Sequence, residues 1–333
     1  MEARTLKATP GITRRGVLTG MGAAVTALSC AGGWAADTTG AQVDAQATAP
    51  NAASAGLMAI GGDLAVNRLG FGAMRITGEG VWGQPKSPAQ ARALLRRAVE
   101  LGVNFIDTAD AYGPGVSEEL IYQALHPYPH GLVIATKGGF TRPSADRWQA
   151  DGSPGHLRAA CEASLQRLHL ERIDMYQLHV PDPNVPLEES MGELARLRQE
   201  GKIRHIGVSN VDLSQLQRAL AVAPVVSVQN RYNVAYRSED ILQFCAIQRL
   251  ALLPWEPLAG SEPRTASAEG PLQALELIAR QRGVSTARVA LAWLHAHSGA
   301  ILPIPGTSSR EHLQDNVAAA ALRLTPEEMQ QLG

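Results

Sequence analysis

Residues 103–113 read Val-Asn-Phe-Ile-Asp-Thr-Ala-Asp-Ala-Tyr-Gly, an apolar run that ends in a polar turn closed by glycine. The run Val103–Thr108 is rich in branched and aromatic side chains, which is typical of a buried strand. Similar runs lie along the chain at Arg68–Met74, Leu132–Lys137, Ile173–His179, Ile203–Asn210, Val225–Asn230, Ala251–Trp255 and Ala300–Pro305. The sequence therefore predicts eight strands.

Segments with helical periodicity separate most of these runs. Ser87 is a predicted N-cap, Pro88 takes the first helical position, and an apolar stripe from Ala91 to Leu101 stops at Gly102. Thr325 begins a last helix by the same capping pattern. Other helices are predicted at His156–Leu168, Leu187–Gln199, Asp212–Ala221, Leu272–Gln281 and Ser285–His295. Apolar strands that alternate with helices are typical of a parallel sheet covered by helices.

Eight strand–helix units predict an α/β fold, a closed (β/α)8 TIM barrel, which usually takes about 250 residues. An open doubly wound sheet would be expected to carry a Gly-x-Gly-x-x-Gly turn after an early strand, and none stands in that context. Leu57–Val66, with Gly61-Gly62-Asp63 in its middle, predicts an N-terminal β-hairpin cap at the bottom of the barrel. The predicted barrel domain covers residues 56–333.

Residues 1–36 are predicted to be a twin-arginine signal peptide. Arg14 and Arg15 precede an uncharged stretch, Val17 to Trp34, that is too short and too poor in large aliphatic residues for a stable membrane span. The alternatives are a disordered tail with a chance arginine pair and, because of Cys30, a lipoprotein signal. Residues 37–55, rich in Ala, Thr, Gln and Ser, are predicted to be a flexible linker. The predicted signal peptide implies export to the periplasm by the twin-arginine machinery. If residues 1–36 are not a signal peptide, the protein is expected to be cytoplasmic.

Composition excludes several classes of function. Apolar residues make up 45% of the chain and charged ones 18%, which is typical of a soluble globular protein. The 30 basic and 31 acidic side chains leave a net charge of −1, so no nucleic-acid or anionic-lipid partner is predicted. Cys30, Cys161 and Cys245 have no Cys-x-x-Cys spacing, which argues against a zinc site or a disulfide framework.

Polar residues at the carboxyl ends of the predicted strands are candidates for catalysis, because TIM barrels carry their active sites there. Asp107 ends the second strand with Tyr112 in the following loop, and Lys137 and His179 end the next two. Taken singly, Asp107 could cap a turn, Lys137 could reach solvent, and His179 could be an ordinary core histidine. Taken together, Asp107 can keep Lys137 charged, and that charge can lower the pKa of Tyr112 from about 10 to make it a proton donor. His179 can then orient a carbonyl oxygen.

The motifs around these residues, Phe105–Gly113, Ala135–Gly139 and Asp174–His179, resemble the active-site motifs of the aldo-keto reductase family. The resemblance continues in order through Gly201–Asn210, Val228–Asn233 and Pro303–Thr307. It implies a barrel that binds an extended nicotinamide dinucleotide and reduces aldehydes or ketones to alcohols. It also implies that Tyr112 is the general acid and that Lys137 lowers its pKa. Asp107 would hold Lys137, and His179 would orient the carbonyl.

The resemblance also implies which residues hold the nicotinamide. Ser209, Asn210 and Gln229 match positions whose side chains grip the carboxamide. Trp255 falls where the family stacks an aromatic ring on the nicotinamide, although ordinary barrel packing would also account for it. Pro257 and Leu258, in the same loop, are assigned to the same part of the site.

The phosphate end of the predicted cofactor site departs from many relatives, which carry a lysine where this chain has Gly306. Thr307, Ser309 and Arg310 offer hydroxyls, helix N-terminal amides and a guanidinium, which suit a dianionic phosphate. NADPH is therefore the predicted cofactor. NADH is possible, and it gains weight if Arg310 is only a solvated cation. Two further residues match those that read the adenine end, Asp315 and Asn316.

The predicted substrate pocket borders on Met74, Arg75, Trp82 and Trp148. An opening rimmed by aromatic side chains favours an aromatic or heterocyclic aldehyde, so the predicted partner is a small-molecule carbonyl compound. Gly72–Arg75 and the segment that begins at His179 also resemble the branch that contains pyridoxal reductases. A pyridoxal-like substrate follows from that resemblance.

Two other functions stay open at this point. The resembled family includes regulatory or sensing modules that bind NADP with little turnover, but all four catalytic residues are present here. A metal-dependent barrel hydrolase would need His-x-His and carboxylate ligands at strand ends, and His179 stands alone, so no metal is predicted.

Overall fold

The computed structural model describes residues 49–258 and 266–333, and the predicted signal peptide lies outside these ranges. The predicted linker at 37–55 ends earlier than expected. Ala52–Ala55 form a short 3-10 helix, η1, which Asn51 caps by accepting a hydrogen bond from the amide of Ala53. Ala52 is fully buried in an apolar cluster with residues of the barrel. The folded region therefore begins before the predicted boundary at residue 56, because the small Ala52 side chain packs into the core.

Seven parallel strands form one curled sheet in the order β11-β10-β9-β8-β5-β4-β3. Their bounds are β3 (Phe71–Gly72), β4 (Phe105–Asp107), β5 (Val133–Gly138), β8 (Ile173–Leu178), β9 (Ile203–Ser209), β10 (Val225–Gln229) and β11 (Ala251–Leu252). They coincide with seven of the eight predicted runs, and only β5 extends past its run, by one residue to Gly138. All residues of β4 and β5 are buried, as expected of strands covered on both faces.

The eighth predicted run, Ala300–Pro305, is not a regular strand, but it joins the two edges of the sheet. Leu252 of β11 exchanges backbone hydrogen bonds of 2.8 and 2.9 Å with this run. On its other side, the amides of Gly70 and Gly72 donate to the carbonyls of its two prolines, at 2.9 and 3.3 Å. Proline has no amide hydrogen, so this run cannot complete a regular ladder. The result is an α/β fold of the TIM-barrel type.

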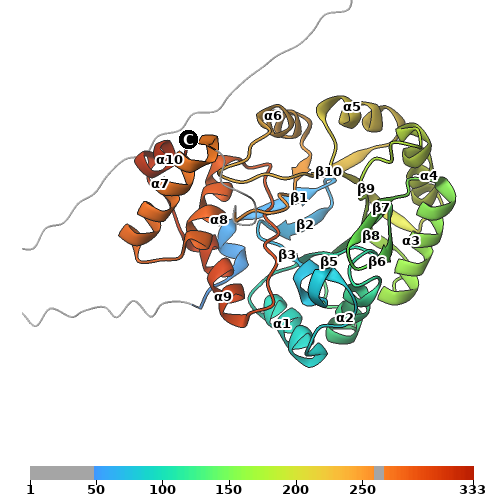
Figure 1. Ribbon diagram of the computed structural model, residues 1–333, viewed down its shortest axis with the longest axis horizontal. Coiled ribbons are helices and arrows are strands. Elements are labelled where there is room, and N and C mark those ends of the chain that lie inside the picture. The colour runs from blue at the N-terminus through green and yellow to red at the C-terminus, as the bar shows by residue number, and fades with distance from the viewer. Residues whose placement is uncertain (1–48, 259–265) are drawn as a thin grey trace, which may run out of the picture. The chain divides into compact units, whose positions relative to one another are not determined.

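Helices surround the sheet, as Figure 1 shows for α1 to α5. The α-helices are α1 (Pro88–Glu100), α2 (Val116–Leu125), α3 (Pro154–Leu168), α4 (Leu187–Gln199), α5 (Leu213–Val222), α6 (Glu239–Gln248), α7 (Ala266–Arg282), α8 (Thr286–His297), α9 (Arg310–Ala318) and α10 (Pro326–Leu332). Short 3-10 turns are η2 (Ala73–Ile76), η3 (Glu79–Val81) and η4 (Ala319–Ala321). Within the described ranges, no helix combines the length and the hydropathy that a membrane crossing requires.

Three predicted helix starts are confirmed by their caps, whereas α3 and α7 begin earlier than predicted, at Pro154 and Ala266. Ser87 accepts a hydrogen bond from the amide of Gln90 at the start of α1. Asp212 and Thr325 each form a complete capping box, at α5 and α10 respectively. Such caps satisfy amides that have no partner within the helix, each worth about 1 kcal/mol.

Two antiparallel hairpins accompany the barrel. The predicted N-terminal hairpin is present as β1 (Leu57–Ile60) and β2 (Leu64–Asn67), and its apolar side chains share a buried cluster with residues of the sheet. The second hairpin, β6 (Phe140–Ser144) and β7 (Arg147–Ala150), directly follows β5 and was not predicted. Its sequence contains a proline at residue 143 and lacks regular alternation, so the pattern gave no strand signal.

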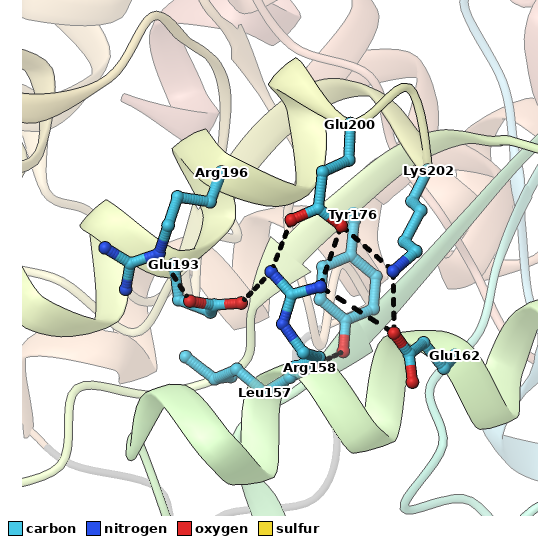
Figure 2. Close-up of polar contacts among 8 residues, drawn as sticks. All are labelled: Leu157, Arg158, Glu162, Tyr176, Glu193, Arg196, Glu200 and Lys202. Carbon is cyan, nitrogen blue, oxygen red and sulfur yellow. Dashed lines mark hydrogen bonds and ion pairs between the residues drawn. The ribbon is translucent and has the colours of Figure 1, made fainter.

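Charged side chains join α3, α4 and the start of β9 on the outside of the sheet (Figure 2). Arg158 of α3 contacts Glu193 of α4 at 2.7 Å and Glu200 beyond it at 2.6 Å. Lys202 contacts Glu162 at 2.7 Å and Glu200 at 2.9 Å. Because Glu193 is almost fully buried, its carboxylate depends on Arg158 and on Arg196, which lies 2.7 Å away. The network ties two covering helices to the strands that carry the site.

Candidate active site

Adjacent strand ends bring together the four predicted catalytic residues, which we call the tetrad: Asp107, Tyr112, Lys137 and His179. Asp107 is the last residue of β4, Lys137 is the last but one of β5, and His179 follows β8 directly. β4, β5 and β8 are neighbours in the sheet, and Tyr112 lies in the loop after β4. All four side chains are buried, and Lys137 has no exposed surface.

Lys137 and Asp107 form a buried ion pair with an Nζ–Oδ1 distance of 2.6 Å. Nζ also donates to the carbonyl of Thr108 at 2.7 Å. The second carboxylate oxygen, Oδ2, accepts hydrogen bonds from the side-chain amides of Gln177 at 3.1 Å and Gln229 at 2.7 Å. Burial acts to lower the pKa of Lys137, but Asp107 and Tyr112 outweigh it, so the pKa lies above its ordinary value. The site therefore holds a permanent ammonium away from water.

The backbone under Lys137 leaves no room for a side chain at Gly138. A Cβ built on Gly138 would lie 2.0 Å from the hydroxyl oxygen of Tyr176, which donates to the carbonyl of Leu157 on α3. Figure 2 shows this tyrosine directed toward Leu157. Close packing of β5 on β8 thus fixes the strand that positions the ammonium.

The pKa of Tyr112 differs from the prediction. Burial raises it above 10, and the ammonium of Lys137, whose Nζ lies 5.2 Å from the ring centroid, opposes that rise without reversing it. The predicted direction was wrong because complete desolvation of the phenol outweighs one nearby cation that a carboxylate already neutralises in part. Tyr112 is therefore protonated at neutral pH, which is the form that a proton donor needs.

His179 is neutral in this environment. Burial and the positive charge of Lys137 hold its pKa well below 6.5. Its Nδ1 atom is buried without a hydrogen-bond partner among the described residues, whereas its backbone amide donates to the carbonyl of Gly138 at 2.9 Å. A neutral imidazole carries one N–H donor, so this ring can donate to an oxygen in the pocket without adding a charge.

A pocket of about 520 Å³ opens in front of these residues. Predicted site residues that line it are Met74, Arg75, Asp107, Tyr112, Trp148, His179, Ser209, Asn210, Gln229, Trp255, Pro257, Leu258 and Gly306. Residues not predicted that also line it are Gly72, Glu256, Ile304 and Pro305. Lys137, which is paired with Asp107, is not among the lining residues. In the part of the chain that the structure describes, no group of His, Cys, Asp and Glu side chains could hold a metal ion.

The predicted nicotinamide residues are linked to one another. The indole nitrogen of Trp255 donates to the side-chain oxygen of Asn210 at 3.1 Å. The amide nitrogen of Asn210 donates to Ser209 Oγ at 3.1 Å and to the carbonyl of His179 at 3.0 Å. The side-chain amide of Gln229 donates one hydrogen bond to Oδ2 of Asp107. An indole, a hydroxyl and two carboxamides thus hold fixed positions along one wall of the pocket.

The predicted phosphate and adenine residues lie beyond the pocket, around the start of α9. Ser309 caps this helix, and its amide donates to Thr307 Oγ1 at 3.0 Å. Arg310 is exposed at the first helical position, and its guanidinium makes no ion pair or hydrogen bond within the described residues. Asn316 is buried. Asp315 is committed elsewhere, because its carboxylate contacts Arg288 of α8 at 2.5 Å.

The predicted substrate residues separate into two groups. Met74, Arg75 and Trp148 line the pocket, and the ring of Trp148 stands edge-on to Tyr112 with centroids 6.4 Å apart. Trp82 does not line it; its indole faces the guanidinium of Arg142 instead, 5.4 Å from the ring centroid. A contact between Trp82 and the substrate stays a prediction.

Sequence reasoning missed three polar residues next to the site. Gln177, fully buried on β8, is a polar interruption of an apolar strand, the same signal that identified its neighbour His179. Arg142 gave no such signal, because its hairpin was not predicted. Asp110 lies in the motif Phe105–Gly113, but no feature of that motif distinguished its environment from that of Asp107.

Asp110 forms a second acidic position behind the tetrad. Its carboxylate oxygen Oδ1 is enclosed without a hydrogen-bond partner, and Glu118, which is paired with Arg167 at 2.6 Å, lies nearby. Burial, followed by repulsion from Glu118, raises the pKa of Asp110 to about 8. Asp110 is therefore protonated in the folded protein at neutral pH.

We expect Asp110→Asn to change how stability depends on pH. Between pH 5 and pH 8 the unfolded chain has lost this proton and the folded chain keeps it, so rising pH favours unfolding of the wild type. Each pH unit costs at most about 1.4 kcal/mol. Urea unfolding should show the wild type losing on the order of 2–4 kcal/mol relative to the variant across this window.

Asp146→Asn is the matched control for this comparison. The side chain of Asp146 is exposed and its pKa is already below its ordinary value, through a hydrogen bond from Ser144. Its stability difference from the wild type should stay constant from pH 5 to pH 8. Parallel curves for Asp110→Asn and the wild type would show that Asp110 is ionised in the folded state.

Comparison with known proteins gives one consistent result. The sequence model of the aldo/keto reductase family matches residues 68–333 of this chain. An uncharacterised oxidoreductase of Schizosaccharomyces pombe is 43% identical over 284 residues, covering 85% of this chain and 90% of the relative. Pyridoxine 4-dehydrogenase of Escherichia coli is 41% identical over 273 residues, covering 80% and 93%. An aldo/keto reductase of Klebsiella pneumoniae, solved with NADP and acetate, is 30% identical with a TM-score of 0.69, covering 83% and 93%.

Proposed function

We propose that this chain, which belongs to the aldo/keto reductase family of oxidoreductases, uses NADPH to reduce a small aldehyde or ketone to the alcohol. The observation that carries the proposal is the buried Lys137–Asp107 pair beside a protonated Tyr112 and a neutral His179 at one end of a pocket. These groups combine a proton donor, a cation that favours its anion, and an uncharged hydrogen-bond donor.

Each residue has a distinct task in the proposed reaction. Tyr112 donates its proton to the carbonyl oxygen of the substrate, and the phenolate that remains is favoured by the ammonium of Lys137. Asp107, held by Gln177 and Gln229, keeps Lys137 charged. A reduced nicotinamide, when bound, supplies the hydride for the carbonyl carbon. Tyr112 recovers its proton from water after the alcohol has formed.

The residues present fit a nicotinamide dinucleotide. Trp255 offers a ring face at the pocket wall next to the amides of Asn210 and Gln229. At the other end, Arg310 has no partner among the described residues and lies at the N-terminus of α9, where backbone amides favour an anion. A 2′-phosphate matches this donor set, which supports NADPH over NADH.

We expect Arg310→Met to weaken NADPH binding and leave NADH binding unchanged. A charge-assisted hydrogen bond is worth about 1.5–3 kcal/mol, so the Kd for NADPH should rise about tenfold or more. Fluorescence titration of the tryptophans with each nucleotide measures both constants. Arg172→Met is the control, because Arg172 precedes β8 at the opposite end of that strand from the site. Equal weakening of both nucleotides would contradict the phosphate contact.

An aromatic or heterocyclic aldehyde of the pyridoxal kind is the substrate class that we propose. Its support is the aromatic wall made by Tyr112 and Trp148, the exposed Arg75 in the pocket lining, which has no ion pair within the described residues, and the similarity to pyridoxine 4-dehydrogenase. NADPH oxidation with pyridoxal, benzaldehyde and butanal as substrates tests it. A clear preference for butanal would overturn the substrate class, and binding of NADPH without any turnover would favour a sensing module instead.

We also propose that residues 1–36 direct export by the twin-arginine route, supported by the Arg14-Arg15 pair before an uncharged apolar stretch. Changing both arginines to lysine should leave the full-length precursor inside the cell. The unaltered chain should appear in the periplasm with a shortened N-terminus, as fractionation and N-terminal sequencing would show. Equal distribution of the two chains would contradict the signal.

A further inference from the structure

We propose that Arg142 is a positioning residue for the reduction, because its guanidinium ties together the three loops that place Tyr112 and Trp148 at the substrate pocket. This inference rests on the proposed function and assigns a task to a residue outside the tetrad. Arg142 lies on β6, in the hairpin that follows β5, and only 9% of its surface is exposed.

The guanidinium of Arg142 donates to four backbone carbonyls from three separate segments. Nη1 donates to Ala111 at 3.0 Å and to Val81 at 3.2 Å. Nη2 donates to Ala145 at 2.8 Å and to Gly80 at 3.2 Å. Ala111 directly precedes Tyr112, so one of these bonds fixes the backbone next to the proton donor.

The same guanidinium also holds the aromatic wall. Its central carbon lies 3.6 Å from the ring centroid of Trp148 and 5.4 Å from that of Trp82. Trp148 lines the pocket and makes edge contacts with Tyr112, Phe140 and His179. A cation over an indole face contributes about 0.5–2 kcal/mol, more when water is excluded. Trp148 thus contacts the guanidinium of Arg142 as well as the rings of Tyr112 and His179.

Arg142 has no carboxylate partner within the described residues. Carbonyl oxygens and ring faces stabilise its charge instead. They can do so only if they hold fixed positions around the planar guanidinium. A lysine could neither reach four carbonyls nor stack flat on an indole. The arrangement is therefore specific to a guanidinium and depends on the three loops being in place.

Val81, the last residue of η3, shows that this turn is held against a local preference. Its φ is +57°, a left-handed conformation that a β-branched residue rarely adopts. Its carbonyl accepts from Arg142 and also from the amide of Gly113 at 3.1 Å, the residue after Tyr112. Strain of this kind persists only where neighbours over-determine it. Arg142 and Gly113 are those neighbours, and together they couple the Val81 loop to the Tyr112 loop.

Kinetics of Arg142→Met and Arg142→Lys test the proposal against Arg147→Met, a change to an exposed arginine on the same hairpin. Both changes at Arg142 should lower kcat/KM for the aldehyde about tenfold to hundredfold, because small displacements of positioned groups are costly. The Kd for NADPH should stay within about twofold of the wild type, and Arg147→Met should be unaffected. A lysine variant as active as the wild type would overturn the proposal.

A double-mutant cycle with Trp148→Leu separates positioning from a general loss of stability. If Arg142 acts through Trp148, the change at Arg142 should cost much less in the Trp148→Leu background than in the wild type. Fully additive losses would contradict coupling between the two side chains.

Hydrogen exchange gives a readout that does not depend on turnover. The amide of Gly113 should exchange at least tenfold faster in Arg142→Met than in the wild type, while amides of β5 keep their protection. Unchanged exchange at Gly113 together with unchanged kinetics would overturn the proposal. A wild type that reduces no carbonyl compound would contradict the proposed function, and Gly113 exchange would then still decide whether Arg142 orders the loops.

Discussion

Tyr112→Phe should lower kcat for carbonyl reduction by about 10²- to 10⁴-fold, because it removes the group that donates the proton. The phenyl ring keeps the edge contacts to Trp148 and His179, whose centroids lie 6.4 and 5.8 Å from that of Tyr112. NADPH affinity and the free energy of unfolding should therefore stay close to those of the wild type. Stopped-flow or steady-state NADPH oxidation measures kcat, a fluorescence titration measures NADPH affinity, and urea unfolding measures stability.

Tyr122→Phe is the matched control, the same chemical change on α2, where the ring of Tyr122 stacks on His169. Its turnover should equal that of the wild type. If Tyr112→Phe retained turnover within about threefold of the wild type, another group would have to supply the proton. The tetrad would then lose its central member.

Lys137→Met should have the second large effect, on both turnover and stability. Removing the ammonium leaves the buried Asp107 carboxylate with only the amides of Gln177 and Gln229, and breaking a buried ion pair costs about 3–5 kcal/mol. Turnover should fall by about 10²-fold or more, because the phenolate of Tyr112 loses the cation that favours it. Urea unfolding and NADPH oxidation report the two losses separately.

The double variant Asp107→Asn with Lys137→Met distinguishes catalysis from folding. It removes both charges together, so the free energy of unfolding should recover most of what Lys137→Met loses. Turnover should not recover, because no cation faces Tyr112. If turnover returned with stability, Lys137 would act only by supporting the fold.

Most of the fold could be predicted because its signals are local. Strands buried on both faces give continuous apolar runs, and helices begin at side-chain caps such as Ser87, Asp212 and Thr325. The exceptions are segments where local preference and tertiary structure disagree. The run at Ala300–Pro305 closes the barrel through one amide and three carbonyls rather than a regular ladder. The β6–β7 hairpin is held by contacts with other loops, such as the bond from Arg142 to the carbonyl of Ala111.

The tetrad could be predicted because strand ends of a parallel barrel meet at one edge. Properties that depend on long-range packing could not. The net pKa shift of Tyr112 is a balance between desolvation and one cation, and no motif states how deeply the ring is buried. The pairing of Asp315 with Arg288, and the contact of Trp82 with Arg142, likewise follow from elements distant in sequence.

Transfer of deuterium from NADPH that carries deuterium at both hydrogen positions of nicotinamide C4 tests the central claim most directly. The wild type, incubated with the labelled NADPH and pyridoxal or benzaldehyde, should yield an alcohol with deuterium on the former carbonyl carbon, seen by mass spectrometry. Tyr112→Phe should form the same labelled product far more slowly while binding NADPH normally. An unlabelled alcohol, or no alcohol from a wild type saturated with NADPH, would contradict carbonyl reduction by this site.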